Sequence, residues 1–119
     1  MNKFDLNNKN AIITGGAQGF GLDIAKRFLQ SGAKVTIWDI DEKELKKALK
    51  LINDQNLSYD IVDVSDPKII DDVVNKIISK TKIDILINNA GITGSTAELW
   101  NYDYEEWKKI ININLHGTF

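Results

Sequence analysis

The chain has 119 residues, of which 43% are hydrophobic and 27% charged, a composition ordinary for a soluble domain. Fifteen basic against seventeen acidic residues give a net charge of −2, which offers no electrostatic footprint for nucleic acid or an anionic membrane. The lack of cysteine excludes disulfides, thiolate metal sites and cysteine nucleophiles. There is no signal-peptide pattern and no apolar run approaching about 18 residues, so we expect a cytoplasmic protein.

The first third of the chain alternates a short apolar run with an amphipathic segment. Residues 11–14 are typical of a strand buried on both faces. Apolar residues then recur at helical spacing from Phe20, and Gly32 is placed to end that helix. Residues 34–39 are β-branched and aromatic and predict a second strand. A second helix follows, with Asp41 as its N-cap in a capping-box pattern.

The same alternation continues toward the end of the chain. Residues 57–64 are extended and half apolar, and Asp66 with Pro67 predicts the start of a third helix. Residues 83–87 form a fourth, strongly apolar strand, and after a loop a last helical pattern runs to Phe119. Strands that alternate with helices in this way require a parallel sheet with right-handed crossovers. The sequence therefore predicts an α/β fold of the Rossmann type, doubly wound, with helices on both faces.

The number of strands bears on domain organisation. Doubly wound nucleotide-binding folds use about six strands in the order 3-2-1-4-5-6. Four strands are predicted here, and the last helical pattern is still in progress at the final residue. We expect residues 1–119 to be the N-terminal part of a nucleotide-binding domain, without strands five onward.

Half of the eight glycines lie within seven residues, in the loop that joins the first strand to the first helix. Backbone N–H groups and the positive end of the helix dipole face whatever lies above such a turn, which favours an anionic group. These glycines permit positive φ and the close approach of a pyrophosphate, although their spacing, G-x₃-G-x-G, is not the G-x-G-x-x-G fingerprint. A purely structural turn is the alternative, but a position between a strand and a helix favours binding.

Asp39 lies 18 residues beyond Gly21, at the end of the second strand. An acid at this position accepts hydrogen bonds from the ribose 2′-hydroxyl of a dinucleotide and repels a 2′-phosphate. The alternative role of helix N-cap is already filled by Asp41. Neither Gln18 nor Ile40 offers a cation to a phosphate, so the sequence favours NAD over NADP.

Five motifs now stand in register: T-G-G-A-Q-G-F-G at residues 14–21, Asp39, Asp63-Val64, N-N-A-G at residues 88–91, and N-L-H-G at residues 114–117. Together they resemble the short-chain dehydrogenase/reductase family, and the resemblance covers the chain from about residue 8 onward. It implies that the diphosphate is cradled by Gly15, Gly16, Gln18, Gly19, Phe20 and Gly21 and the adenosine ribose flanked by Asp39 and Ile40. It implies also that Asp63 bonds the adenine beside Val64, that Asn89, Ala90 and Gly91 line the path to the nicotinamide ribose, and that Asn114 helps to hold a proton-relay water.

The resemblance implies an oxidoreductase that uses NAD and moves a hydride between nicotinamide and a carbonyl or secondary alcohol. Broadly similar proteins are 3-oxoacyl-carrier-protein reductases and sugar or hydroxy-acid dehydrogenases. A homodimer or homotetramer is implied, with no nucleic-acid or membrane partner. The alternatives are a dinucleotide-binding fragment that cannot catalyse, and an interaction protein that pairs through its open sheet edge.

The family's catalytic Ser and Tyr-x₃-Lys are expected beyond residue 119. Tyr104 and Lys108 have the Tyr-x₃-Lys spacing, but they precede Asn114, so we reject them as the dyad and expect an exposed turn with Trp107 buried. Phe20 is larger than the aliphatic residue usual at its position, and we expect it to pack on the sheet. His116 has no second ligand at metal spacing, so no metal site is expected.

Overall fold

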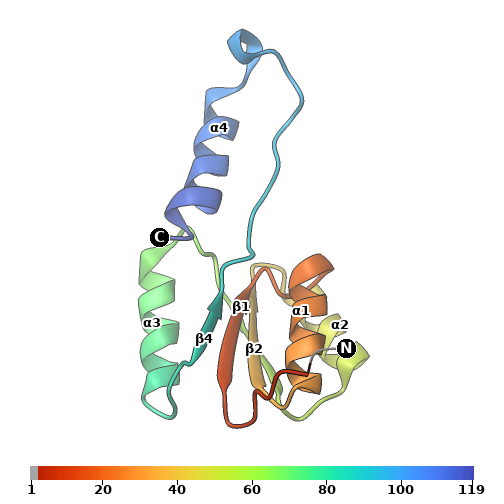
Figure 1. Cartoon of the computed structure of the whole chain (residues 1–119). Coiled ribbons are helices and arrows are strands. Elements are labelled where there is room, and N and C mark those ends of the chain that lie inside the picture. Colours follow the sequence, from red (N-terminus) through yellow and green to blue (C-terminus); the bar gives the residue numbers. More distant parts are fainter. Residues whose placement is uncertain (1–2) are drawn as a thin grey trace.

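The computed structural model describes residues 3–119, in which four parallel strands form one sheet in the order β3-β2-β1-β4 (Figure 1). The strands are β1 (Asn10–Thr14), β2 (Lys34–Asp39), β3 (Leu57–Ile61) and β4 (Ile85–Ile87). The helices are α1 (Gly19–Gln30), α2 (Glu42–Ile52), α3 (Pro67–Ile78) and α4 (Tyr104–Ile111), with a 3₁₀ turn at Leu99–Asn101 and a wider π-type turn at Asn112–His116. This order confirms the Rossmann-type sheet, and β1 and β4 flank the point where the strand order reverses.

Helices cover both faces of the sheet, α1 and α2 on one side and α3 on the other (Figure 1). Beneath α1 and α2 lie Ile13 and Ile37, fully buried with Leu45 of α2. Ile12 and Trp38 point to the opposite face and pack under α3. Because successive strand residues point to opposite faces, a strand covered on both sides must be apolar throughout. The continuous apolar runs in the sequence have this cause.

Two strands are shorter than the sequence pattern predicts. The third ends at Ile61 instead of continuing to Val64, because the chain turns there toward the start of α3. The fourth begins at Ile85 and not at Ile83, whose half-buried side chain packs against the cluster of Ile12, Trp38 and Val62. An apolar run thus includes residues that pack against the core without pairing in the sheet.

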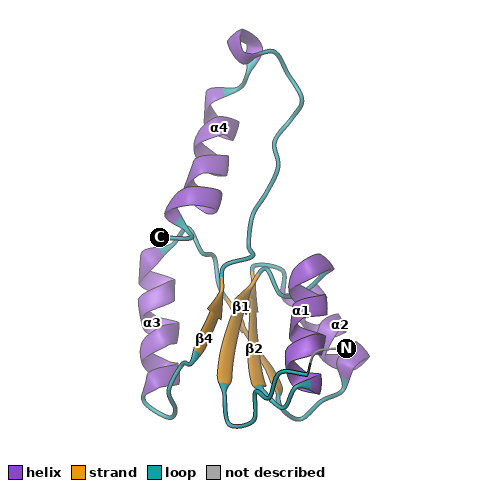
Figure 2. Cartoon of the chain, in the orientation of Figure 1, coloured by secondary structure: helices purple, strands orange, loops and turns teal. Residues whose placement is uncertain are grey.

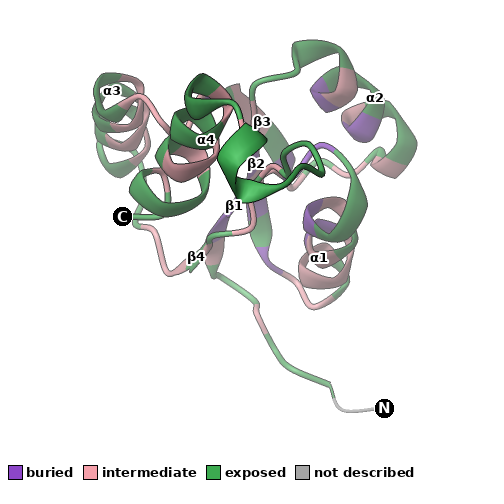
Figure 3. Ribbon diagram, turned by 90° about the horizontal axis from the view of Figure 1, so that it is seen from above, coloured by how far each residue is buried: buried purple, intermediate pink, exposed green. Residues whose placement is uncertain are grey.

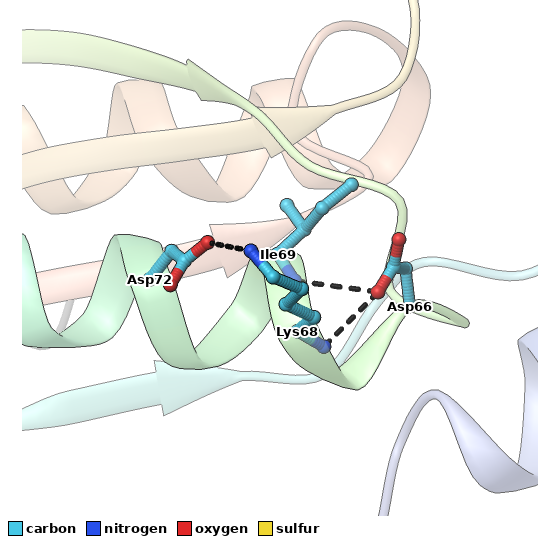
Figure 4. A network of polar contacts seen from close by, with 4 residues as sticks. All are labelled: Asp66, Lys68, Ile69 and Asp72. Carbon is cyan, nitrogen blue, oxygen red and sulfur yellow. Dashed lines mark hydrogen bonds and ion pairs between the residues drawn. The ribbon is translucent and has the colours of Figure 1, made fainter.

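The start of α3 is capped by Asp66, as the Asp-Pro pair predicts (Figure 4). Its carboxylate accepts hydrogen bonds from the backbone N–H groups of Lys68 at 3.0 Å and Ile69 at 3.3 Å. Pro67 occupies the first turn, where a missing N–H costs nothing. Lys68 also pairs with Asp72 one turn later, at 2.9 Å.

The predicted capping box of α2 is half formed. Asp41 accepts from the Glu44 N–H at 3.1 Å, but the Asp41 N–H donates to Asp39 and the Glu44 carboxylate pairs with Lys47. The helix is therefore capped in one direction only, and its N-cap backbone is tied to the end of β2. At the end of α1, Gly32 adopts a φ of +92°, as its predicted role as a helix stop requires.

A long loop separates β4 from α4. The helix α4 lies beyond the carboxyl ends of the strands (Figure 2). Seen from above, most of α4 and the turn before it are exposed (Figure 3). Trp107 is 49% exposed, so the expectation that it is buried was wrong. No sheet face lies beneath it, and its ring forms a T-shaped pair with the ring of Tyr102, with centroids 6.2 Å apart. No helix among residues 3–119 is both long and apolar enough to span a membrane.

The β1–β4 pair is fastened at both ends by side chains. At the amino end the Asn10 N–H donates to Asp84 Oδ2 at 2.9 Å, and Lys82 pairs with the same carboxylate at 2.9 Å. Lys82 and the Asn10 N–H lower the pKa of Asp84, since both stabilise its charged form. At the carboxyl end the buried Thr14 hydroxyl accepts from the N–H groups of Asn89 at 3.0 Å and Ala90 at 2.9 Å.

The Asp84 contacts predict a pH-dependent contribution to stability. Because the pKa is lowered in the folded state, the contribution is complete above about pH 4, the pKa of an unfolded aspartate, and is lost as the pH falls through the folded value. Asp84→Asn is expected to lower the midpoint of urea unfolding at pH 7, and the difference from wild type should vanish in acid. Asp72→Asn, at an exposed ion pair, is the control and should change little. A deficit of Asp84→Asn that stays constant down to pH 2.5 would contradict this account.

Thr14→Val keeps the shape of the side chain but removes the acceptor of two backbone N–H groups. We expect it to lower the free energy of unfolding by about 1–3 kcal/mol, the cost of leaving a buried polar group unpaired. The matched control is Thr36→Val, because the Thr36 hydroxyl only meets that of Ser58 at an exposed position. Equal losses for the two variants, measured by urea unfolding, would show that the Thr14 hydroxyl does not join the strands.

Candidate functional site

The glycine loop needs glycine for three different reasons. Gly15 and Gly19 have φ of +61° and +59°, in the left-handed region that other residues rarely adopt. Gly16 packs against β2, because an added Cβ there would come within 2.7 Å of the Ile37 side chain. At Gly21 an added Cβ would collide with the Gly15 carbonyl, so only glycine lets α1 start this close to the loop. The loop is thereby held at the carboxyl end of the sheet.

The first turn of α1 suits an anionic group. Gln18 occupies the N-cap in extended conformation and makes no side-chain cap, and the first turn of this helix contains no acidic residue. The backbone N–H groups at this end are thus not used by a cap, and the helix dipole adds positive potential. Phe20 is 85% exposed, so the expectation that it packs on the sheet was wrong. Gly21 takes the buried side of this turn and leaves Phe20 on the outer side.

The end of β4 is locked to the glycine loop. The Asn89 side-chain amide donates to the carbonyls of Thr14 and Gly15, both at 3.1 Å. A Cβ on Gly15 would come within 2.9 Å of the Ala90 Cα, so the two segments touch. The amide of Asn89 therefore shapes the loop. Thr14 accepts hydrogen bonds from the same segment and is a site residue that the sequence motifs do not single out, because spacing alone does not reveal its partners 75 and 76 positions away.

Asp39 ends β2 beside the loop, where the spacing predicts it. Its Oδ2 accepts from the Ala17 N–H at 3.3 Å and its Oδ1 from the Asp41 N–H at 3.2 Å. The next residue, Ile40, is 67% exposed and places no charge at this edge. A carboxylate thus stands next to the loop, with an apolar residue beside it.

Asp63 and Val64 follow β3 at the same edge of the sheet. The Asp63 carboxylate accepts from the N–H and hydroxyl of Ser65, at 2.9 and 2.6 Å, and so shapes its own turn. Val64 lies close to Gly117 near the end of the chain. A Cβ added to Gly117 would be only 2.8 Å from the Val64 side chain. The structure brings these two residues to the edge that also carries the glycine loop and Asp39.

Asn114 binds the segment that follows β4. Its Oδ1 accepts from the Ile92 N–H and its Nδ2 donates to the Ile92 carbonyl, both at 2.8 Å. An added Cβ on the neighbouring Gly91 would lie 3.4 Å from Asn114 Oδ1. Both polar atoms of the Asn114 side chain therefore bond to the Ile92 backbone, which pairs with this amide as it would with the backbone of a neighbouring strand. The contact fixes the turn after α4 against the end of the sheet.

The rejected Tyr-x₃-Lys pair has a different geometry from a proton-transfer dyad. Lys108 Nζ lies over the face of the Tyr104 ring, 5.2 Å from its centroid, and pairs with Glu105 at 3.2 Å. His116 contacts Asn112 at 2.9 Å. Among residues 3–119 no three His, Cys, Asp or Glu residues gather where they could hold a metal ion.

Comparisons with known proteins agree with this arrangement. The model of the short chain dehydrogenase family matches residues 9–119. The 3-oxoacyl-[acyl-carrier-protein] reductase of Chlamydia muridarum is 40% identical over 116 residues, which are 94% of this chain and 46% of the relative. The 3alpha-hydroxysteroid dehydrogenase of Mediterraneibacter gnavus is 34% identical over 119 residues, 96% of this chain and 47% of the relative.

Solved structures give the same result for the fold. The 3-ketoacyl-(acyl-carrier-protein) reductase of Brucella melitensis, complexed with NADH, superposes with a TM-score of 0.88 at 36% identity and covers 95% of this chain and 47% of its own. The NADP complex of Pseudomonas aeruginosa RhlG gives 0.87 at 28% identity, with 98% and 46% covered. The chain belongs to the short-chain dehydrogenase family of oxidoreductases and spans about half the length of the curated relatives it matches.

Proposed function

We propose that this protein is an NAD-dependent oxidoreductase that transfers a hydride between the nicotinamide and a carbonyl or secondary alcohol. The observation that carries the proposal is the carboxylate of Asp39 against the glycine loop, 3.3 Å from the Ala17 N–H. Residues 1–119 are, in this proposal, the N-terminal part of the nucleotide-binding domain. The proposed location is the cytoplasm, and the proposed assembly is a homodimer or homotetramer.

The residues at the carboxyl edge fit a dinucleotide. An added Cβ would collide with Ile37 at Gly16 and with the Gly15 carbonyl at Gly21, so glycine at both positions lets the loop fold closely over the sheet end, and the turn at Gln18, which has no side-chain cap, leaves N–H groups for a diphosphate. A bound nicotinamide supplies the hydride donor or acceptor at its C4 atom. In this proposal the remaining cradle residues, Gly15, Gly19 and Phe20, contact the diphosphate, Asp63 and Val64 border the adenine, and Asn89, Ala90 and Gly91 line the way to the nicotinamide ribose.

Preference for NAD over NADP follows from charge. Solved relatives occur with NADH and with NADP, so membership of the family does not decide between them. Two unit charges about 5 Å apart at an effective dielectric constant of about 20 repel by roughly 3 kcal/mol, and solvent screening at this open edge leaves about 1–2 kcal/mol. Asp39 would impose this repulsion on a 2′-phosphate, and the exposed Ile40 offers no compensating cation.

The substrate class is a ketone or secondary alcohol, of the kind named for the relatives: 3-oxoacyl groups and hydroxysteroids. A second candidate function is dinucleotide binding without turnover. The two candidates differ in whether the protein oxidises or reduces any substrate when saturated with cofactor.

Cofactor preference is tested by measuring the Kd of NAD and NADP by calorimetry for the full-length protein and for Asp39→Ala/Ile40→Arg. Wild type should bind NAD about 5- to 30-fold more tightly than NADP, the ratio that a screened repulsion of about 1–2 kcal/mol gives. The double variant should reverse or abolish that preference, because it removes the repelling charge and adds a cation that pairs with phosphate. Ile40→Arg alone is the control for an added charge. An unchanged ratio in the double variant would refute cofactor selection at this position.

We propose Asn114 as a positioning residue for the catalytic half of the site. Asn114→Ala releases the Ile92 backbone and is expected to lower kcat of the full-length enzyme by about 10- to 100-fold, the scale of a small misplacement, with the Kd of NAD little changed. Amide exchange at Ile92 should accelerate in the same variant. Asn112→Ala, which removes only a contact to His116, is the matched control. Normal kcat together with fast exchange at Ile92 would contradict the positioning role.

A further inference from the structure

We propose that Asp39 also anchors the glycine loop, so that one carboxylate both selects the adenosine ribose and holds the diphosphate cradle in shape. The ligand in this inference rests on the proposed function. The anchoring itself is a property of the protein without any cofactor. Its consequence is that removal of Asp39 weakens the binding of a dinucleotide even when the ligand has no hydroxyl for Asp39 to bind.

The two oxygens of the Asp39 carboxylate bind different elements. Oδ2 accepts from the Ala17 N–H in the loop between β1 and α1, and Oδ1 accepts from the Asp41 N–H at the start of α2. Asp41 in turn caps α2 through the Glu44 N–H. The carboxylate thus joins the glycine loop, the end of β2 and the N-terminus of α2.

Ala17 is the point at which the loop is attached to the core. Its side chain is 3% exposed within the cluster beneath α1 and α2, and the preceding Gly16 donates to the Trp38 carbonyl at 3.1 Å. Two residues further on, an added Cβ on Gly19 would meet no atom within 4 Å, so that side of the loop is open. The hydrogen bond from Ala17 to Asp39 thus comes directly before the N–H groups that are proposed to face a diphosphate.

A role confined to the ribose and a role in the loop make opposite predictions. If Asp39 acts only on the ribose, its removal leaves a hydroxyl-free ligand unaffected, or improves binding because a negative charge near the diphosphate is lost. If Asp39 holds the loop, its removal leaves the Ala17 N–H without its acceptor, and the cradle loses its shape for every dinucleotide. The charge effect and the anchoring effect thus have different signs.

The first test needs no cofactor. Amide hydrogen exchange is measured for Ala17 in full-length wild type, Asp39→Ala and Asp63→Ala. Asp63→Ala is the matched control, because it removes a carboxylate from the neighbouring strand end whose bonds are to Ser65 in its own turn. We expect exchange at Ala17 to accelerate about tenfold in Asp39→Ala, the effect of losing one hydrogen bond to a charged acceptor, and to stay at the wild-type rate in Asp63→Ala. Wild-type exchange in Asp39→Ala would overturn the inference.

The second test measures the Kd of NAD and of its analogue with a 2′,3′-dideoxyadenosine moiety. Asp39→Ala should weaken binding of the analogue about fivefold or more, because the lost anchor is worth about one hydrogen bond. Equal or tighter binding of the analogue by Asp39→Ala would overturn the inference. Should Asp39→Ala fail to fold, Asp39→Asn replaces it. Its amide keeps one acceptor oxygen, so it should show a smaller loss, and no loss in either test would overturn the inference.

The proposed function can fail separately. If wild type binds neither NAD nor NADP, the proposed cofactor is wrong, while the exchange rate of Ala17 still decides whether Asp39 anchors the loop. If wild type binds NAD and the Ala17 exchange rate does not depend on Asp39, the proposed function stands and the anchoring is refuted.

Discussion

The arrangement of the site depends on the junction between the carboxyl ends of β1 and β4. The strand order reverses between these two strands, which is the position where open α/β sheets bind their ligands. The buried Thr14 hydroxyl holds the two strand ends together through two backbone N–H groups, and Asn89 returns two hydrogen bonds to the loop. Without this junction the glycine loop would have no fixed wall on the β4 side.

The opposite wall of the loop is supplied by β2. Gly16 lies against Ile37 and donates to the Trp38 carbonyl, and Asp39 receives the Ala17 N–H. The loop is therefore clamped between the ends of two strands that flank β1 on either side. This explains why four glycines are needed within so few residues: two adopt positive φ, and the other two allow the chain to pass close to β2 and to α1.

The last part of the chain is attached to this framework in a different way. α4 lies beyond the sheet, contains no buried residue and leaves Trp107 exposed, so it has little hydrophobic burial to hold its position. The pair of hydrogen bonds between Asn114 and Ile92 attaches this part of the chain to the segment after β4. The hydrogen bond between Ser95 and Glu106 is a second attachment. Polar contacts to the segment after β4 thus place the helix relative to the carboxyl edge.

Much of the fold and of the site was predictable because local physics determines it. Apolar runs revealed strands covered on both faces, Asp66 and Pro67 revealed the start of α3, and the glycine spacing marked the loop. Only the tertiary structure decided the hydrogen bonds that Thr14 accepts from Asn89 and Ala90, the bond between Ala17 and Asp39, and the exposure of Phe20 and Trp107. Each depends on which residues far apart in the chain come to lie together, with Thr14 and Asn89 75 positions apart and Ala17 and Asp39 22 apart. Such pairings follow from strand register and crossover geometry, which no local pattern encodes.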